Sequence, residues 1–135
     1  VDSSASAVGN VTLSADRVVA ITSAPPLEFD GPGDQWSPEG LLCAAVADCF
    51  ILTFRAIARA SKYEWKSLQC HVEGVLERAD GITKFTRFRT RATLTVAAGS
   101  DMERARMLLD KAEHGCLITN SLTATRELQA EVITG

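Results

Sequence analysis

The chain has 135 residues, of which 46% are hydrophobic and 23% charged, a composition typical of one ordinary globular protein. This length favours a single domain over residues 1–135. The composition excludes collagen, coiled-coil and low-complexity arrays. The formal net charge of -3 lacks the basic excess of nucleic-acid-binding proteins, so we expect no nucleic-acid partner.

Neither the first residues nor the apolar segments suggest export or a membrane. Residues 1–6 lack the basic and apolar regions that begin a secretory signal. The longest apolar run, 41–54, is shorter than the roughly 20 residues of a membrane helix, and Asp48 interrupts it. We therefore expect a cytoplasmic protein with no membrane partner.

The N-terminal third is predicted to hold a small hairpin and a long loop. Residues 11–13 and 17–22 form two short apolar runs around Ala15 and Asp16, a pattern typical of paired strands. The segment 24–34 is rich in proline and glycine and cannot form a central strand. Loops of this length in compact domains are often functional.

A long central helix is predicted from Ser37 to about Ser61. Ser37 can cap its start, Pro38 suits the first helical position, and Glu39 favours the positive end of the helix dipole. The helix is apolar nearly all round at 41–54, so we expect it to be buried on most sides. A second subunit is the simplest cover for the side that one sheet leaves open, which predicts a homodimer. A second internal layer of helix is the alternative.

Two strands follow, at 67–78 and from Gly81 to about 96, each with alternating apolar residues. An odd-length turn with Gly81 in the left-handed region would keep their apolar faces together and place Glu73 near Arg87. We interpret the arginine row on the opposite face as solvated and paired with glutamates. A nucleic-acid surface is the less favoured alternative. The row consists of Arg87, Arg89 and Arg91.

The C-terminal part is predicted to contain a helix, a short second helix and a closing strand. Residues 100–103 form a capping box, and Gly115 ends the helix that follows it. A short turn of helix at 116–122 and a strand at 126–134 complete the chain. Strands and helices in blocks favour an α+β fold, with an antiparallel sheet packed on the long buried central helix.

The four cysteines include no CxxC pair, and with only two histidines they predict no metal site and no cofactor. Cys43, Cys49 and Cys70 lie on apolar faces, where each alone favours a packed core thiol. Cys116 follows a helix-ending glycine and lies near a helix N-terminus, where free N–H groups stabilise a thiolate. For Cys116 a reactive role and an ordinary capping role are equally open.

Two sequence blocks resemble the OsmC/Ohr family, named for osmotically inducible protein C and organic hydroperoxide resistance protein. The first is Ser-Pro-Glu-Gly-Leu-Leu at 37–42, followed by Ala-Ala-Val-Ala-Asp-Cys-Phe at 44–50, with ten residues from Glu39 to Cys49. The second is Cys-Leu-Ile-Thr-Asn-Ser-Leu at 116–122. The order of the predicted elements is also similar to that of the family.

The resemblance implies a thiol-dependent peroxidase that reduces organic hydroperoxides and forms an OsmC-like intertwined homodimer. By resemblance, Cys49 attacks the peroxide, Cys116 resolves the sulfenic acid to a disulfide, and Glu39 orients an arginine. The family's arginine position falls near Ala7, and Arg17 is the only arginine before the central helix, so Arg17 is the candidate for that role. The implied reductant is a dithiol such as a lipoyl group.

Two other functions compete with this one. The absent arginine favours a redox-responsive or small-ligand-binding dimer on the same fold, with little peroxidase turnover. A purely structural domain, with cysteines as core filler, would keep Cys49 and Cys116 too far apart to bridge.

Overall fold

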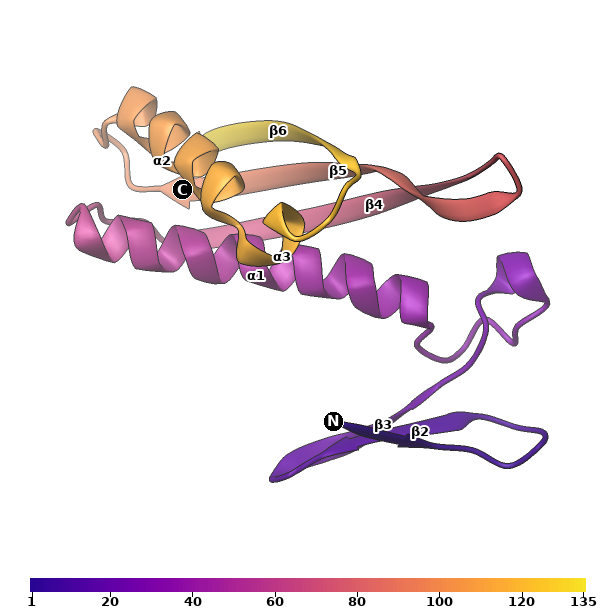
Figure 1. Cartoon of the computed structure of the whole chain (residues 1–135). Helices are drawn as coiled ribbons and strands as arrows, with labels where there is room; N and C mark the ends of the chain where they lie inside the picture. The colour runs from indigo at the N-terminus through magenta and orange to yellow at the C-terminus, as the bar shows by residue number, and fades with distance from the viewer. The chain divides into compact units, whose positions relative to one another are not determined.

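The computed structural model describes every residue, Val1–Gly135, and divides the chain into two compact units. The N-terminal unit is Val1–Leu42 and the C-terminal unit is Cys43–Gly135. Each unit contains one three-stranded sheet, with strand orders β1-β2-β3 and β4-β5-β6 (Figure 1). The predicted α+β class is confirmed, and the single domain over residues 1–135 stays a prediction.

The N-terminal unit is an antiparallel sheet followed by an irregular loop. Its strands are β1 (Asp2–Ser4), β2 (Val11–Ala15) and β3 (Val18–Ser23), so the predicted hairpin is confirmed. The sequence analysis did not predict β1, because its Asp-Ser-Ser residues have little strand propensity. The predicted loop contains one short 3-10 turn, η1 (Leu27–Phe29).

The central helix is α1 (Pro38–Ala60), and it begins where the sequence predicts. Ser37 Oγ accepts a hydrogen bond from the Gly40 backbone N–H at 3.0 Å, which caps the first turn. Buried residues occur at every fourth position, a spacing that forms one narrow stripe along the helix. They are Val46, Phe50, Phe54 and Ala58.

The prediction that α1 is buried on most sides is wrong for the single chain. Only the one stripe is buried, and Leu52 on another face is 48% exposed. The helix has 23 residues, longer than the apolar run at 41–54, and by length and composition it could cross a membrane. Core helices of soluble proteins have the same length and composition, so this property does not decide between the two environments.

Strands β4 (Ser67–Ala79) and β5 (Ile82–Val96) form a long antiparallel hairpin with a two-residue turn. The turn residues have positive φ, 54° at Asp80 and 76° at Gly81. Two successive left-handed residues make the turn that best matches the twist of a hairpin, and Asp-Gly is a favoured sequence for it. The predicted odd-length turn is therefore wrong.

A β-bulge supplies the odd residue that the turn lacks. Leu76 pairs with Phe85, whereas Val75 pairs with Arg87, so Thr86 is an extra residue in β5. An extra residue shifts the alternation of one strand by one position. The apolar faces of the two strands are thus kept together, as predicted, but by a bulge in β5 and not by an odd-length turn.

The bulge also sets which charged side chains meet on the outer face of the sheet. Glu73 pairs with Arg89, at 3.0 Å between Oε1 and Nη1, and not with Arg87 as the odd-length turn predicted. Glu127 of β6 lies 3.5 Å from both Arg87 and Arg89. The interpretation from the sequence is confirmed for Arg87 and Arg89. Arg91 forms no ion pair, and Glu77 accepts a hydrogen bond from the Thr86 hydroxyl rather than from an arginine.

The third strand, β6 (Thr125–Thr134), runs parallel to β5, so the predicted all-antiparallel sheet is wrong. Two helices, α2 (Met102–Gly115) and α3 (Leu117–Asn120), lie between these strands in the chain. A helical crossover carries the chain back along the sheet, which makes the next strand parallel to the one before it. Asp101, and not Ser100 of the predicted capping box, caps α2 by accepting the Arg104 N–H at 3.0 Å.

The core of the C-terminal unit lies on one face of the β4-β5-β6 sheet. The stripe of α1 and the inner face of α2 pack together there against inward side chains of β5 and β6. Phe54 adds an edge-to-face contact with Trp65 at 5.4 Å between ring centroids. The buried cluster comprises Phe50, Phe54, Ala58, Tyr63, Ala92, Leu94, Val96, Ala105, Leu108, Leu109, Ala112 and Val132.

Leu109→Ala should destabilise the protein strongly, because Leu109 is 0% exposed. Replacing a buried leucine by alanine removes apolar contacts and leaves a cavity, at a cost of about 2–5 kcal/mol. Met107 lies on the same helix and is 60% exposed, so Met107→Ala is the matched control. Urea unfolding at one fixed protein concentration measures both, and equal losses for the two variants would contradict this core.

Candidate active site

Cys49 lies on α1 at the edge of the buried stripe, immediately before Phe50, and is partly exposed. Thr53 follows one helical turn later, with 3.8 Å between Cys49 Sγ and Thr53 Oγ1. Residues four apart lie on one helix face, so the hydroxyl and the thiol point to the same side. The central helix thus presents a thiol together with a hydrogen-bond donor.

Cys116 lies at the break between two helices, where it follows α2 and caps the start of α3. Its backbone is extended, with φ -66° and ψ 105°, and its side chain is 1% exposed. Thr119 Oγ1 donates a hydrogen bond to Cys116 Sγ at 3.1 Å. The predicted position of Cys116 near a helix N-terminus is confirmed.

The structure brings Cys49 and Cys116 together. Each thiol lies close enough to shift the pKa of the other, and Leu117 and Ile118, which follow Cys116, line the same hollow as Cys49. This proximity contradicts the separation that a purely structural role for the cysteines predicted. Two neighbouring thiols can form a disulfide when one of them is oxidised.

The two thiols differ in acidity because burial and the groups around them shift their pKa values in opposite directions. Burial raises the pKa of Cys49, but hydrogen bonds from Ile118, Cys116, Thr53 and Leu117 outweigh it and leave the pKa below its usual value. Burial raises the pKa of Cys116, and its interaction with Cys49 raises it further. Cys49 is therefore the more acidic thiol of the pair.

The remaining cysteines are weakly acidic. Burial raises the pKa of Cys70 to about 11, with smaller contributions from Glu113 and Cys116. Burial also raises the pKa of Cys43. Both are protonated at neutral pH, which agrees with their interpretation as packed core thiols.

A hollow of about 580 Å³ lies beside Cys49 within the C-terminal unit. Its walls come from α1 and from the start of α3, and they are apolar except for Asp48, Thr53 and the thiol itself. Such a hollow suits an apolar molecule that reaches the sulfur. The lining residues are Ala45, Asp48, Cys49, Leu52, Thr53, Ala56, Ile57, Leu117 and Ile118.

The other two candidate residues lie in the N-terminal unit. Arg17 occupies the β2–β3 turn with φ 63°, and its side chain is 92% exposed and forms an ion pair with the adjacent Asp16 at 3.6 Å. Glu39 is in the first turn of α1, and its Oε2 is buried without a hydrogen-bond partner. The ion pair of Arg17 is thus with Asp16 and not with Glu39.

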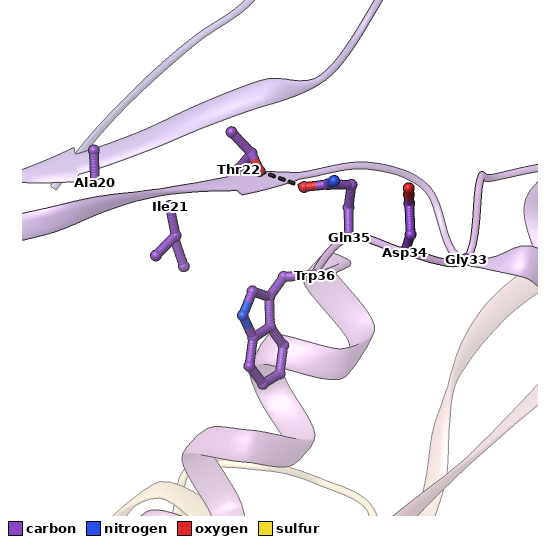
Figure 2. A pocket seen from close by; sticks show the side chains of 7 residues that line it. All are labelled: Ala20, Ile21, Thr22, Gly33, Asp34, Gln35 and Trp36. Atoms are coloured by element: carbon purple, nitrogen blue, oxygen red, sulfur yellow. Dashed lines mark hydrogen bonds between the residues drawn. The ribbon is translucent and has the colours of Figure 1, made fainter.

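A second hollow, also of about 580 Å³, lies in the N-terminal unit between β3 and the loop before α1 (Figure 2). The hydroxyl of Thr22 is hydrogen-bonded to the Gln35 side chain at one end of it. The side chains of Ile21 and the half-exposed Trp36 both extend downward in Figure 2, away from this hydrogen bond. This hollow holds no nucleophile, so we do not assign it to the chemistry.

Comparison with known proteins matches residues 31–131 to the family described as OsmC-like protein. The chain belongs to the OsmC-like protein family. The uncharacterized protein YmaD of Bacillus subtilis (strain 168) is 32% identical over 109 residues, which cover 78% of this chain and 73% of YmaD. The membership expected from the two cysteine blocks is confirmed.

Solved structures share the fold of this OsmC-like protein at lower identity. An organic hydroperoxide resistance protein OsmC from Legionella pneumophila has a TM-score of 0.76 at 23% identity, covering 97% of this chain and 93% of its own. An organic hydroperoxide resistance protein from Elizabethkingia anophelis has a TM-score of 0.75 at 20% identity, covering 100% and 97%. An OsmC-like protein of unknown function from Vibrio cholerae has a TM-score of 0.77 at 22% identity, covering 93% and 82%.

The sequence analysis of this OsmC-like protein missed the two threonines that contact the sulfurs. Thr53 lies four residues after Cys49, and Thr119 lies three residues after Cys116. These are the spacings at which side chains on one helix meet. A search for hydroxyl residues at those spacings from each cysteine would have found both.

Thr53→Val should raise the pKa of Cys49, because it removes a hydroxyl that donates to the thiolate. A thiolate that loses a donor forms only at higher pH, so the half-point of alkylation by iodoacetamide should move upward. Peptide mass spectrometry across a pH series measures this half-point at Cys49. In the unsubstituted protein Cys49 should react before Cys43 and Cys70, and a Cys49 half-point that Thr53→Val leaves unmoved would contradict the assigned hydrogen bond.

Proposed function

We propose that this OsmC-like protein is a thiol peroxidase that reduces organic hydroperoxides with Cys49 and Cys116. The observation that carries the proposal is that Cys49 shares an apolar hollow with the residues that follow Cys116, and that the two thiols shift each other's pKa, downward at Cys49 and upward at Cys116. The thiolate is the nucleophile in thiol chemistry, so the more acidic partner attacks. Two solved relatives carry the name organic hydroperoxide resistance protein, which supports the substrate class.

The reaction has three steps that balance in atoms and electrons. The Cys49 thiolate attacks the O–O bond, and the sulfur becomes a sulfenic acid while the alkoxide takes a proton and leaves as the alcohol. The thiol of Cys116 then attacks the sulfenic sulfur, which forms the disulfide and releases water. A dithiol, such as a lipoyl group, returns both cysteines to thiols and is itself oxidised to a disulfide.

The hollow beside Cys49 favours an apolar peroxide over hydrogen peroxide. Its walls are mainly aliphatic side chains, including Leu52 and Ile57 from α1 and Leu117 and Ile118 from α3. Burying an alkyl group there contributes roughly 25 cal/mol per Å² of apolar surface removed from water. Hydrogen peroxide has no alkyl group and gains nothing from this contact.

The assembly that we propose is a homodimer. Several large apolar side chains are left exposed, among them Leu52 at 48% and Trp36 at 50%. Soluble proteins rarely expose many such groups unless another surface covers them. A second copy of this chain would cover them; further exposed members of this set are Val18, Val19, Leu27 and Phe29.

Glu39 and Arg17 would act across this dimer. Glu39 precedes Cys49 by ten residues on one helix, and an α-helix rises about 15 Å over that length. This is too long for direct contact with the same sulfur, so the Glu39 that serves a given Cys49 would come from the other copy. The buried, unpartnered Oε2 of Glu39 calls for a donor, and the exposed guanidinium of Arg17 can supply one.

A second candidate is a redox-responsive or small-ligand-binding dimer with little turnover. One observation favours it: every interaction that lowers the pKa of Cys49 is a hydrogen bond from a neutral group, with no cation among them. Sustained consumption of peroxide with a dithiol reductant distinguishes the enzyme from this alternative. For either function we expect a cytoplasmic location, where thiols are kept reduced.

Cys49→Ser should abolish the consumption of cumene hydroperoxide, because it removes the attacking sulfur. Cys116→Ser should still reduce one equivalent and then stop, because the sulfenic acid has no resolving thiol. Dimedone labelling and mass spectrometry would detect that trapped sulfenic acid at Cys49. Cys70→Ser is the matched control and should retain turnover with dihydrolipoamide; full activity in Cys49→Ser would refute the proposal.

Mixing two inactive variants should restore activity when Glu39 and Cys49 of one site come from different copies. A heterodimer of Glu39→Gln with Cys49→Ser contains one site with both native groups and one site with neither. After unfolding and refolding the mixture, peroxide consumption should rise above that of either parent towards about a quarter of native activity, since half the dimers are mixed. A mixture no more active than its parents would place both groups on one copy.

A further inference from the structure

Arg126, the second residue of β6, joins the two ends of the stretch that contains Cys116. This stretch, residues 113–120, is called the Cys116 segment below. Nη1 of Arg126 donates to the Glu113 carbonyl oxygen at 3.0 Å and to Asn120 Oδ1 at 2.9 Å. Nε lies 3.3 Å from the Glu113 carboxylate. The contacts fall three residues before Cys116 and four residues after it.

This arrangement differs from an ordinary surface ion pair. Glu113 is 7% exposed, and the Arg126 side chain is 26% exposed. Burial raises the pKa of Glu113, and the charge of Arg126 acts to lower it again. The backbone of Arg126 is fixed in the sheet opposite Phe88, so the guanidinium is held from a rigid element.

The Cys116 segment carries every group of the C-terminal unit that reaches Cys49 from outside α1. These groups are the Cys116 thiol and the N–H groups of Leu117 and Ile118. The Glu113 carbonyl accepts both from Arg126 and from the Cys116 N–H, the latter at 3.4 Å. Nη1 thus binds an acceptor on each side of the break between α2 and α3, Nε faces the Glu113 carboxylate, and Nη2 is buried without a hydrogen-bond partner. The planar guanidinium therefore holds the break from both sides.

We propose that Arg126 is a positioning residue that holds the Cys116 segment, so that Cys116 stays within bridging distance of Cys49. The effect of Arg126 on peroxide turnover rests on the proposed function, but the effect of Arg126 on the rate of disulfide formation does not. Without the contacts of Arg126, the break between α2 and α3 can move, and Cys116 moves with it. A small displacement of a reacting group slows an intramolecular step steeply. The step affected is disulfide formation, after the first attack.

Two variants separate this role from general stabilisation. Arg126→Lys keeps a positive charge beside Glu113, but a single ammonium cannot reproduce the planar fork. The pair Glu113→Gln with Arg126→Gln removes both buried charges and leaves neither one unpaired, so it should fold if the lysine variant does not. Arg104→Lys is the control, because Arg104 also holds α2, through the Ser61 carbonyl and the Tyr63 ring, at the opposite end of the helix.

The experiment measures how fast diamide closes the Cys49–Cys116 disulfide in the reduced full-length chain. Diamide takes two electrons and two protons from the two thiols and becomes the hydrazine, so the assay needs no peroxidase activity. Quenched samples are analysed by non-reducing peptide mass spectrometry. The half-point of Cys49 alkylation against pH is measured on the same variants, and thermal unfolding checks that they fold.

We expect both Arg126 variants to close the disulfide about tenfold more slowly or worse, and to alkylate Cys49 only at higher pH, while Arg104→Lys behaves as the native chain. Native rates in a folded Arg126 variant would overturn the proposal. Equal slowing in Arg104→Lys would also overturn it, since that indicates general destabilisation. Slower closure with diamide supports the positioning role even if the native chain does not consume cumene hydroperoxide. Failure to consume the peroxide would contradict the proposed function but not the positioning role.

Discussion

The packing of one apolar stripe of α1 against the sheet and α2 determines where the candidate chemistry lies. Phe50 and Phe54 are fully buried in that cluster, so the helix cannot rotate without exposing them. Cys49 and Thr53 each immediately precede one of these phenylalanines, and successive helical residues differ by about 100° around the axis. Burying the two rings therefore turns the thiol and the hydroxyl together to the edge of the stripe.

The partner thiol reaches that edge because the chain breaks its helix at Cys116. If the helix ran without a break from Met102 to Asn120, the direction of the Cys116 side chain would be set only by its position on that helix. The extended backbone of Cys116 instead starts a new short helix, whose first N–H groups lack intrahelical acceptors. Cys49 supplies an acceptor for those of Leu117 and Ile118, so the groups that a helix start leaves unpaired become the groups that stabilise the thiolate.

Sequence alone predicted the elements that carry strong local signals. Ser37 and Pro38 located the start of α1, and Gly115 marked the end of α2. The hairpin shows the limit of local signals. The alternation of apolar residues in β4 and β5 requires one extra residue, whereas the Asp80-Gly81 dipeptide forms a two-residue turn that does not supply it. The compensating bulge at Thr86 depends on cross-strand register, which no local signal carries.

For the candidate site, the sequence predicted the two cysteines but not how they shift each other's pKa, because the two residues are 67 positions apart. Nor could periodicity predict the parallel β6, whose direction follows from the crossover through α2 and α3.

The C-terminal unit contains the thiol of lowered pKa, Cys49, its neighbour Cys116 and an apolar hollow, and the groups that lower this pKa are all neutral. The N-terminal unit contains a buried carboxylate oxygen of Glu39 without a hydrogen-bond partner. It also contains the exposed guanidinium of Arg17, which pairs only with the adjacent and equally exposed Asp16. A buried acceptor without a donor is costly, and so is an apolar helix face in water. In the proposed dimer, association of two copies would remove both costs in one step, and it would also supply the cation that Cys49 lacks. The stability of the dimer and the reactivity of Cys49 would then have the same origin.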